Sequence, residues 1–236
     1  MLLVFIDESS DEKFKEYLGL CCAVVNSRFY GPIKQRFQAI LQKGGWSETI
    51  EFKGQYLFSA TRGDTSVGLD KRIDMASQII ALTASKTNSR MTFVHAGTKT
   101  KDQKAEYLSL LPDLLKRALP RAGTGPGKNL ITLHCDCRSD ISCDQIRQAV
   151  SAAIKTRGYT LVEDIVQSRS GFHTVGILFA DIVGYLAARY QTISTDSELF
   201  VNLSPEQLSK NGKYRKLTTS TNLLGLIKRF RLFEVK

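Results

Sequence analysis

The sequence predicts one α/β domain built on a mixed sheet. Two strand-like apolar runs come first, and helical and strand-like patterns then alternate, which is typical of a mixed sheet flanked by helices. The chain has 236 residues, of which 42% are hydrophobic and 24% charged. It is therefore long enough to bury a core, and its composition excludes disordered, collagen-like and disulfide-scaffold proteins.

The first two strands are predicted from continuous apolar runs. Residues 2–6 are apolar up to Asp7, and residues 18–25 form a second run, a pattern that suits buried strands. The polar residues 9–16 between them predict a hairpin turn.

A helix is expected after this hairpin. Residues 30–42 carry apolar side chains at helical spacing, and Pro32 suits a first turn. Two glycines at 44–45 end the pattern. A loop that holds Trp46 and residues 51–54 follows.

Helical and strand patterns alternate through the middle of the chain. They predict helices over residues 69–83 and 101–119, and strands over residues 91–95 and 130–136. The glycine-rich residues 123–128 lack a phosphate-loop signature and precede a strand, so we expect a turn there.

The last part of the chain ends in a basic extension. Residues 143–157 predict a helix, residues 159–166 a strand, and residues 174–190 an apolar helix interrupted by Asp181. Residues 196–236 hold eight Lys and Arg against four Asp and Glu. We expect them to pack on the same domain.

The charge balance favours polyanionic partners. The chain has 33 Lys and Arg against 23 Asp and Glu, a formal net charge of +10 and a pI near 9.4, which favours nucleic acid first and an anionic membrane second. No signal peptide and no apolar run of roughly 18 residues is recognisable. The expectation is a cytoplasmic protein with reduced thiols and no membrane partner.

Three aspartates stand in surroundings that ordinarily exclude carboxylates. Asp7 and Asp136 follow apolar strand patterns, and Asp181 lies inside the apolar helix. A buried lone carboxylate is costly unless it is paired or bound to metal. Because strand ends meet at one edge of an α/β sheet, the three acids could converge on one or two Mg²⁺ or Mn²⁺ ions.

Each acid also has an ordinary structural explanation. Asp7 could cap a turn, Asp136 could cap the next helix, and Asp181 could pair with Arg189 or Lys53. The set of three on one edge favours a site over three separate structural roles.

A zinc site is a weaker alternative. It could combine His134, Cys135, Cys137 and Cys143, but paired Cys-x-x-Cys knuckles are missing. Buried thiols are favoured.

Four short segments resemble the DUF3800 family, in the family's order. They are residues 5–9 (Phe-Ile-Asp-Glu-Ser), residues 51–54 (Glu-Phe-Lys-Gly), Asp136 after a strand, and residues 179–185 (Phe-Ala-Asp-Ile-Val-Gly-Tyr). The resemblance implies a ribonuclease H-like mixed sheet flanked by helices in residues 1–195, with a helical insertion at about residues 60–120.

The resemblance also implies the site residues. Ribonuclease H-like nucleases bind metal through four carboxylates, which here would be Asp7, Glu51, Asp136 and Asp181. Lys53 would hold a phosphate or orient Glu51, and Glu8 and Ser9 would support the site.

Other polar residues could assist. Ser170, in a polar loop before the last helix, could touch phosphate, and Asp140 and Asp144 are rival ligands that more simply begin a helix. The three histidines lack the frame of a nucleophilic hydrolase. An aromatic interleaved with basic residues could bind a nucleic-acid strand; it comprises Lys213, Tyr214, Arg215 and Lys216.

Two positions depart from the family pattern. Ser10 replaces a glycine, and Leu178 replaces a glutamine one turn from Asp181. The predicted function is nonetheless a metal-dependent nuclease that hydrolyses phosphodiester bonds of RNA, DNA or a hybrid. The alternatives are a hydrolase of small phosphoesters and a non-catalytic module of a mobile-element or phage-defence system, which binds nucleic acid or regulates a partner. A homodimer or an operon-encoded protein partner is compatible with each of these functions.

Overall fold

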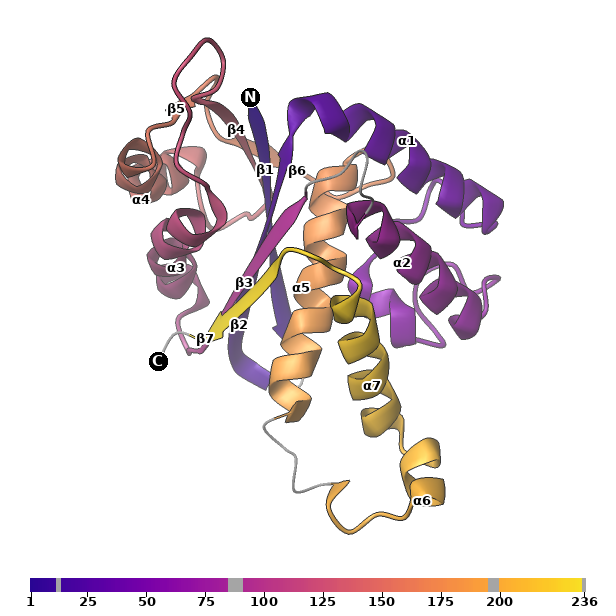
Figure 1. The fold of residues 1–236 in the computed structure, drawn as a ribbon. Helices are drawn as coiled ribbons and strands as arrows, with labels where there is room; N and C mark the ends of the chain where they lie inside the picture. Colours follow the sequence, from indigo (N-terminus) through magenta and orange to yellow (C-terminus); the bar gives the residue numbers. More distant parts are fainter. Residues whose placement is uncertain (12–13, 85–90, 195–199, 235–236) are drawn as a thin grey trace.

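The computed structural model describes residues 1–11, 14–84, 91–194 and 200–234, in which a seven-stranded mixed sheet lies between two layers of helices (Figure 1). The strands are β1 (Leu2–Asp11), β2 (Phe14–Asn26), β3 (Thr92–Lys99), β4 (Leu130–Asp136), β5 (Thr160–Leu161), β6 (Val166–Ser168) and β7 (Phe230–Glu234). The helices are α1 (Ser27–Lys43), the 3-10 helix η1 (Gly54–Phe58), α2 (Leu69–Ala84), α3 (Gln103–Ala118), α4 (Cys143–Thr156), α5 (Val175–Ser194), α6 (Pro205–Lys210) and α7 (Gly212–Gly225).

The sheet order is β5-β4-β1-β2-β3-β7, and β6 also pairs with β4. Strand β2 is antiparallel to β1 and β3, whereas β4 is parallel to β1 and β7 is parallel to β3. This arrangement confirms the expected fold class at the level of an α/β mixed sheet flanked by helices.

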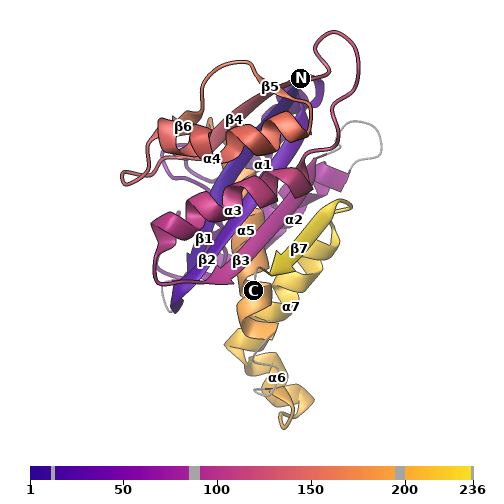
Figure 2. The same cartoon turned by 90° about the vertical axis from the view of Figure 1, so that its left-hand side faces the viewer.

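Alternation along β1 divides its side chains between two cores. Val4 and Ile6 belong to the core under α3 and α4, whereas Phe5 belongs to the core under α1, α2, α5 and α7. Because successive side chains of a strand point to opposite faces, Asp7 shares the α5 face with Phe5, and Glu8 shares the α3/α4 face with Ile6. Figure 2 shows α3 and α4 side by side in front of the sheet.

The hairpin and the first helix differ from the prediction in their bounds. Strand β1 continues to Asp11 and β2 begins at Phe14, so both strands extend into the polar residues expected to form the turn. Helix α1 begins at Ser27, capped by the Asn26 side chain, which accepts a hydrogen bond from the Arg28 amide. Pro32 therefore lies inside the helix and not in its first turn.

Two other segments contain more than the pattern predicted. Residues 60–120, expected as a helical insertion, hold α2 and α3 with β3 between them, and β3 joins the sheet next to β2. The strand expected over residues 159–166 is divided into β5 and β6, which pair with different parts of β4.

The basic extension packs on the same domain. Helix α7 lies against α5, and β7 adds an edge strand beside β3. Helix α6 and the start of α7 project from the body of the molecule (Figures 1 and 2).

Candidate functional site

Asp7 and Asp136 occupy neighbouring positions on the parallel strands β1 and β4. The last paired residues are Ile6 and Cys135, and each aspartate directly follows one of them. Asp136 ends β4 as predicted, but Asp7 lies in the middle of β1 because that strand continues beyond the end of its partner. Asp7 is 5% exposed, so its carboxylate has lost most of its hydration.

Asp181 reaches the same face of the sheet from α5. The helix is buried along most of its surface because the sheet, α1 and α7 surround it. Asp181 Oδ2 accepts a hydrogen bond from the Gly54 amide at 2.5 Å. A Cβ at position 54 would lie 2.4 Å from the Cβ of Tyr185, so only glycine permits this approach to the helix.

The segment that carries Glu51 and Lys53 is anchored by the residue between them. Phe52 is buried and packs edge-on against Trp46, with ring centroids 4.8 Å apart. Trp46 Nε1 in turn donates to the Ile50 carbonyl at 2.8 Å. Because Phe52 points into the core, Glu51 and Lys53 stay partly exposed, and they form an ion pair of 2.8 Å.

A buried arginine that the sequence analysis did not single out fixes the rest of this loop. The Arg72 guanidinium is 1% exposed and lies 5.5 Å from the Trp46 ring centroid. It donates to five backbone carbonyls, those of Tyr56, Ser59, Arg62, Asp64 and Val67. These contacts connect α2 to η1 and so hold the segment that delivers Gly54 to Asp181.

The pKa values of the aspartates show that they interact. Burial raises the pKa of Asp7 well above its usual value, and the negative charges of Asp181 and Asp136 raise it further. Burial also raises the pKa of Asp181, to about 6, although the Gly54 amide and the Lys53 charge oppose the rise. The charges of Asp136 on β4 and Asp181 on α5 thus act on the buried carboxylate of Asp7 on β1.

Lys53 is the ammonium group that faces this region. Burial acts to lower its pKa, but the hydrogen bond and charge of Glu51 and the charges of Asp181 and Asp136 outweigh burial, so the pKa is raised. The structure therefore brings together Glu51, Lys53 and the three aspartates, as the resemblance implied.

Each aspartate has one oxygen held by a hydrogen bond. Asp7 Oδ1 accepts from the next amide of the chain at 2.7 Å, and Asp136 Oδ1 accepts from the amide and hydroxyl of Ser170 at 3.2 and 3.0 Å. Asp181 is held by Gly54 as above. Over the described ranges, the second oxygen of each aspartate accepts no hydrogen bond.

The chemistry of these oxygens fits a hard divalent cation. Carboxylate oxygens are the ligands that Mg²⁺ and Mn²⁺ prefer. Within the part of the chain that the structure describes, no group of three or more His, Cys, Asp or Glu side chains forms an arranged metal site. The aspartates are therefore a set of suitable donors and not a preformed cage.

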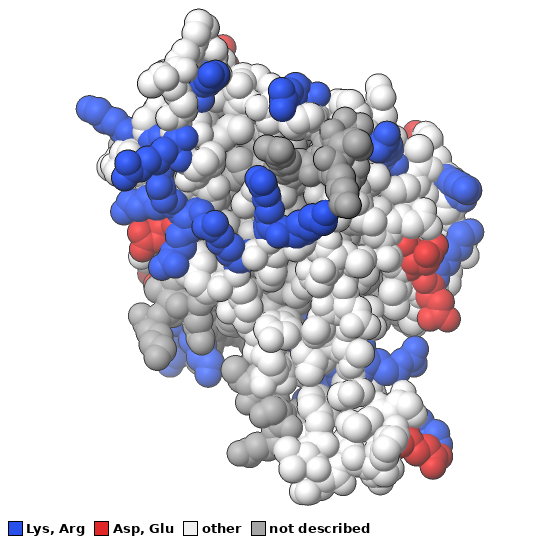
Figure 3. Space-filling model, viewed as in Figure 1, with Lys and Arg blue, Asp and Glu red and all other residues white. Residues whose placement is uncertain are grey.

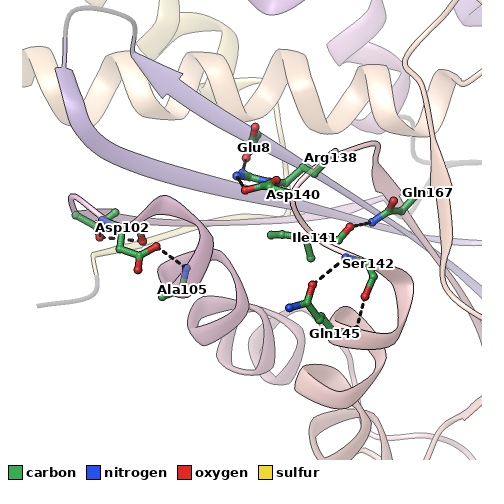
Figure 4. A network of polar contacts seen from close by, with 10 residues as sticks. Glu8, Asp102, Ala105, Arg138, Asp140, Ile141, Ser142, Gln145 and Gln167 are labelled. Atoms are coloured by element: carbon green, nitrogen blue, oxygen red, sulfur yellow. Dashed lines mark hydrogen bonds and ion pairs between the residues drawn. The ribbon is translucent and has the colours of Figure 1, made fainter.

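Glu8 lies on the other face of the sheet, away from the aspartates. Its carboxylate pairs with Arg138, which also forms two 2.9 Å bonds with Asp140 and lies 5.1 Å from the Tyr107 ring centroid (Figure 4). Burial raises the pKa of Glu8, and Arg138 opposes that rise. Arg138 thereby connects β1, next to Asp7, to the loop that follows Asp136.

Ser170 and Ser9 have different roles. Ser170 holds Asp136, whereas the Ser9 hydroxyl lies 3.2 Å from Nε2 of the buried His95. Burial lowers the pKa of His95 to about 3, so this imidazole is neutral. Ser9 therefore packs beside the site without contacting the aspartates in any hydrogen bond that the structure describes.

Asp140 and Asp144, the other candidate ligands, form ion pairs elsewhere, and Asp136 does not cap the next helix. Helix α4 is capped by Ser142 and not by Asp136. Asp140 pairs with Arg138, and Asp144 pairs with Arg147. His173 is exposed and precedes α5, and the ring of His134 stacks on Phe5.

The predicted basic–aromatic segment lies in the first turns of α7, which projects from the body (Figure 1). The Tyr214 ring packs edge-on against Phe200, with centroids 5.4 Å apart, and Lys213 and Arg215 are exposed. The tyrosine thus has a packing partner, and nucleic-acid binding by this segment stays a prediction.

Comparisons with known proteins do not assign the chain to a family. No family model and no curated protein matches it, so the resemblance to DUF3800 stays a prediction. Among solved structures, the chain is similar to one described as the PCNA:RNase HII complex from Archaeoglobus fulgidus, with 11% identity and a TM-score of 0.39 over 97% of this chain and 92% of that chain. Among the described residues, no helix has the length and hydropathy to span a membrane.

Proposed function

We propose that the protein is a divalent-metal-dependent nuclease that hydrolyses phosphodiester bonds of nucleic acid. The observation that carries the proposal is the convergence of Asp7, Asp136 and Asp181 from three elements, where the charges of Asp181 and Asp136 raise the pKa of the buried Asp7 and the charge of Asp136 raises that of Asp181. A cation would relieve this repulsion, and the oxygens without hydrogen bonds are suitable ligands.

The chain's own residues would have distinct roles. The three aspartates and Glu51 would hold Mg²⁺ or Mn²⁺, which when bound would supply a Lewis acid for the attacking and leaving oxygens of a phosphodiester. The Gly54 amide fixes the orientation of the Asp181 carboxylate. Lys53, which is partly exposed beside Glu51, would hold a phosphate oxygen of the substrate.

The net charge of +10 supports nucleic acid as the substrate. A cytoplasmic location and reduced cysteines belong to the same proposal.

A cleavage assay tests the proposal. End-labelled RNA, DNA and hybrid duplexes are incubated with wild type in Mg²⁺, in Mn²⁺ and in EDTA, beside Asp7→Asn and Asp181→Asn. Asp144→Asn is the matched control, because it removes an exposed carboxylate on the other face of the sheet. Cleavage should require the metal, fall by about a hundredfold or more in both site variants, and persist in the control. Wild-type rates in Asp7→Asn would contradict the proposal.

A non-catalytic binding module is the second candidate. It is favoured by the lack of a formed metal site among the described residues and by Leu178 in place of the family's glutamine. Binding of nucleic acid or of a protein partner, without cleavage in any divalent ion, would support it.

A further inference from the structure

Basic side chains gather on the face of the sheet opposite the three aspartates. Figure 3 shows Lys and Arg, with few acids among them, over the region where α3, α4 and β7 lie in Figure 1. We propose that this surface binds the phosphate backbone of double-stranded nucleic acid. We call it the arginine surface, and its residues are Lys116, Arg117, Arg121, Lys155, Arg157, Arg229 and Arg231.

Contacts between the ends of two helices form one part of the arginine surface. The Arg157 guanidinium, just after α4, donates to the Lys116 carbonyl in the last turn of α3. The Ala122 amide donates to the Arg157 carbonyl at 2.9 Å, which places the neighbouring Arg121 beside the same helix end.

Contacts with the edge strand form the other part. The Arg117 guanidinium lies 4.1 Å from the centroid of the Phe233 ring. Arg231 pairs in register with Val94, whose side chain belongs to the core under α3 and α4. Because strand side chains alternate, Arg231 and Phe233 project toward α3. Arg229 directly precedes β7, and its carbonyl accepts a hydrogen bond from the Phe93 amide at 2.8 Å.

Few carboxylates neutralise the positive charge of the arginine surface. Across the described ranges, none of the five arginines forms an ion pair with Asp or Glu, although Lys116 pairs with Asp113 at 3.4 Å. Basic residues in the last turn of a helix are favoured by the helix dipole, which accounts for Lys116, Arg117 and Lys155. Arg157 directly follows α4, but the helix dipole does not account for Arg121, Arg229 and Arg231, which lie beyond the helix ends.

The side chains of this surface match phosphate better than bases or lipid. Five of its seven residues are arginine, whose guanidinium forms paired hydrogen bonds with phosphate oxygens. Single strands are ordinarily held by bases that stack on exposed aromatic rings. In the described residues, the exposed large apolar side chains include no aromatic ring; they are Met1, Leu69, Val162, Val166, Val201 and Leu226. The arginine surface therefore suits a duplex held by its backbone, independently of sequence.

This inference goes beyond the proposed function, because binding at the arginine surface uses none of the carboxylates. The duplex would be held across the α3/α4 face by its phosphates, on the side of the sheet away from the aspartates.

The test is duplex binding without catalysis. Fluorescent DNA and RNA duplexes are titrated in EDTA with wild type, Arg121→Glu/Arg231→Glu and the matched control Arg36→Glu/Lys43→Glu on α1, at salt concentrations from about 50 to about 200 mM. All four side chains are exposed, and the two double variants change the net charge equally. The first variant should weaken binding about tenfold or more and reduce the salt slope by about two, with a much smaller loss in the control.

Several outcomes would overturn the inference. They are equal weakening in both double variants, no duplex binding by wild type, tighter binding to single strands than to duplexes, and binding only to vesicles that contain anionic lipid. If thermal unfolding shows that the glutamate variant is misfolded, Arg121→Gln/Arg231→Gln replaces it, with a salt slope again reduced by about two. Asp7→Asn, which tests cleavage, should bind the duplex like wild type, so the two proposals fail independently.

Discussion

The two faces of the sheet surround neighbouring carboxylates of β1 with different partners. Asp7 points toward α5 and interacts with Asp136 and Asp181, and the charge of Lys53 opposes part of the negative charge at Asp181. The next residue, Glu8, points toward α3 and α4, where Arg138 neutralises it. The protein thus neutralises the carboxylate of Glu8 with its own arginine, whereas the aspartates on the other face would be neutralised by a bound metal ion.

Arg72→Met is expected to lower the free energy of unfolding most. It removes contacts that lie only on the α5 face of the sheet. Five backbone carbonyls would lose their donor, and leaving buried polar groups unsatisfied should lower the free energy of unfolding by about 3–5 kcal/mol in urea titrations. Lys71→Met, the neighbouring exposed cation, is the control. If the two faces are independent, any folded fraction of Arg72→Met still binds duplexes; a selective loss of duplex binding would show that they are coupled.

The second largest effect is expected from Asp181, whose ionisation should make the stability of the protein depend on pH. The pKa of Asp181 is raised from 3.8 to about 6, so its unfavourable charge is absent below about pH 4 and develops as pH rises through 6. Without divalent ions, Asp181→Asn should match wild type near pH 4 and be more stable at pH 7, by up to about 3 kcal/mol. Thermal unfolding across this pH range measures the difference. A variant that is less stable than wild type at pH 7 would show that the charge of Asp181 does not destabilise the folded protein.

A smaller effect is expected on the opposite face from Arg138→Met. Removing the cation leaves Glu8 partly buried without its partner, so unfolding free energy at pH 7 should fall by about 1–2 kcal/mol. Adding Glu8→Gln should recover most of this loss, which a double-mutant cycle in urea measures. Additive losses would mean that the pair does not neutralise Glu8.

The sequence was sufficient to predict the fold class and most elements. Continuous apolar runs located β1 and β2, and helical spacing located α2, α3, α4 and α5 close to their observed bounds. It placed the start of α1 too late, because the cap at Asn26 precedes the apolar pattern. The segment after α4 forms two strands, β5 and β6, because its two parts pair with different residues of β4. The local sequence pattern contains no information on which residues pair.

The candidate site could be predicted in part. Aspartates within apolar patterns were a sufficient signal for Asp7, Asp136 and Asp181, and the resemblance added Glu51 and Lys53. Strand alternation could have placed Glu8 on the other face, since it directly follows Asp7.

Arg72 and Arg138 could not be recognised from the sequence. Their roles depend on backbone carbonyls and a carboxylate distant in the chain, and an arginine in an amphipathic helix or a polar loop is ordinarily solvated. The arginine surface likewise combines residues from three segments that only the fold brings together.

Calorimetric titration of Mn²⁺ determines whether these aspartates form a cation site. Wild type, Asp7→Asn and the control Asp144→Asn are compared at pH 7, where a bound cation would relieve the repulsion among the aspartates. We expect saturable binding by wild type and the control, and its loss in Asp7→Asn. Equal binding by all three proteins, or none by wild type even with a duplex present, would contradict a cation site formed by these aspartates.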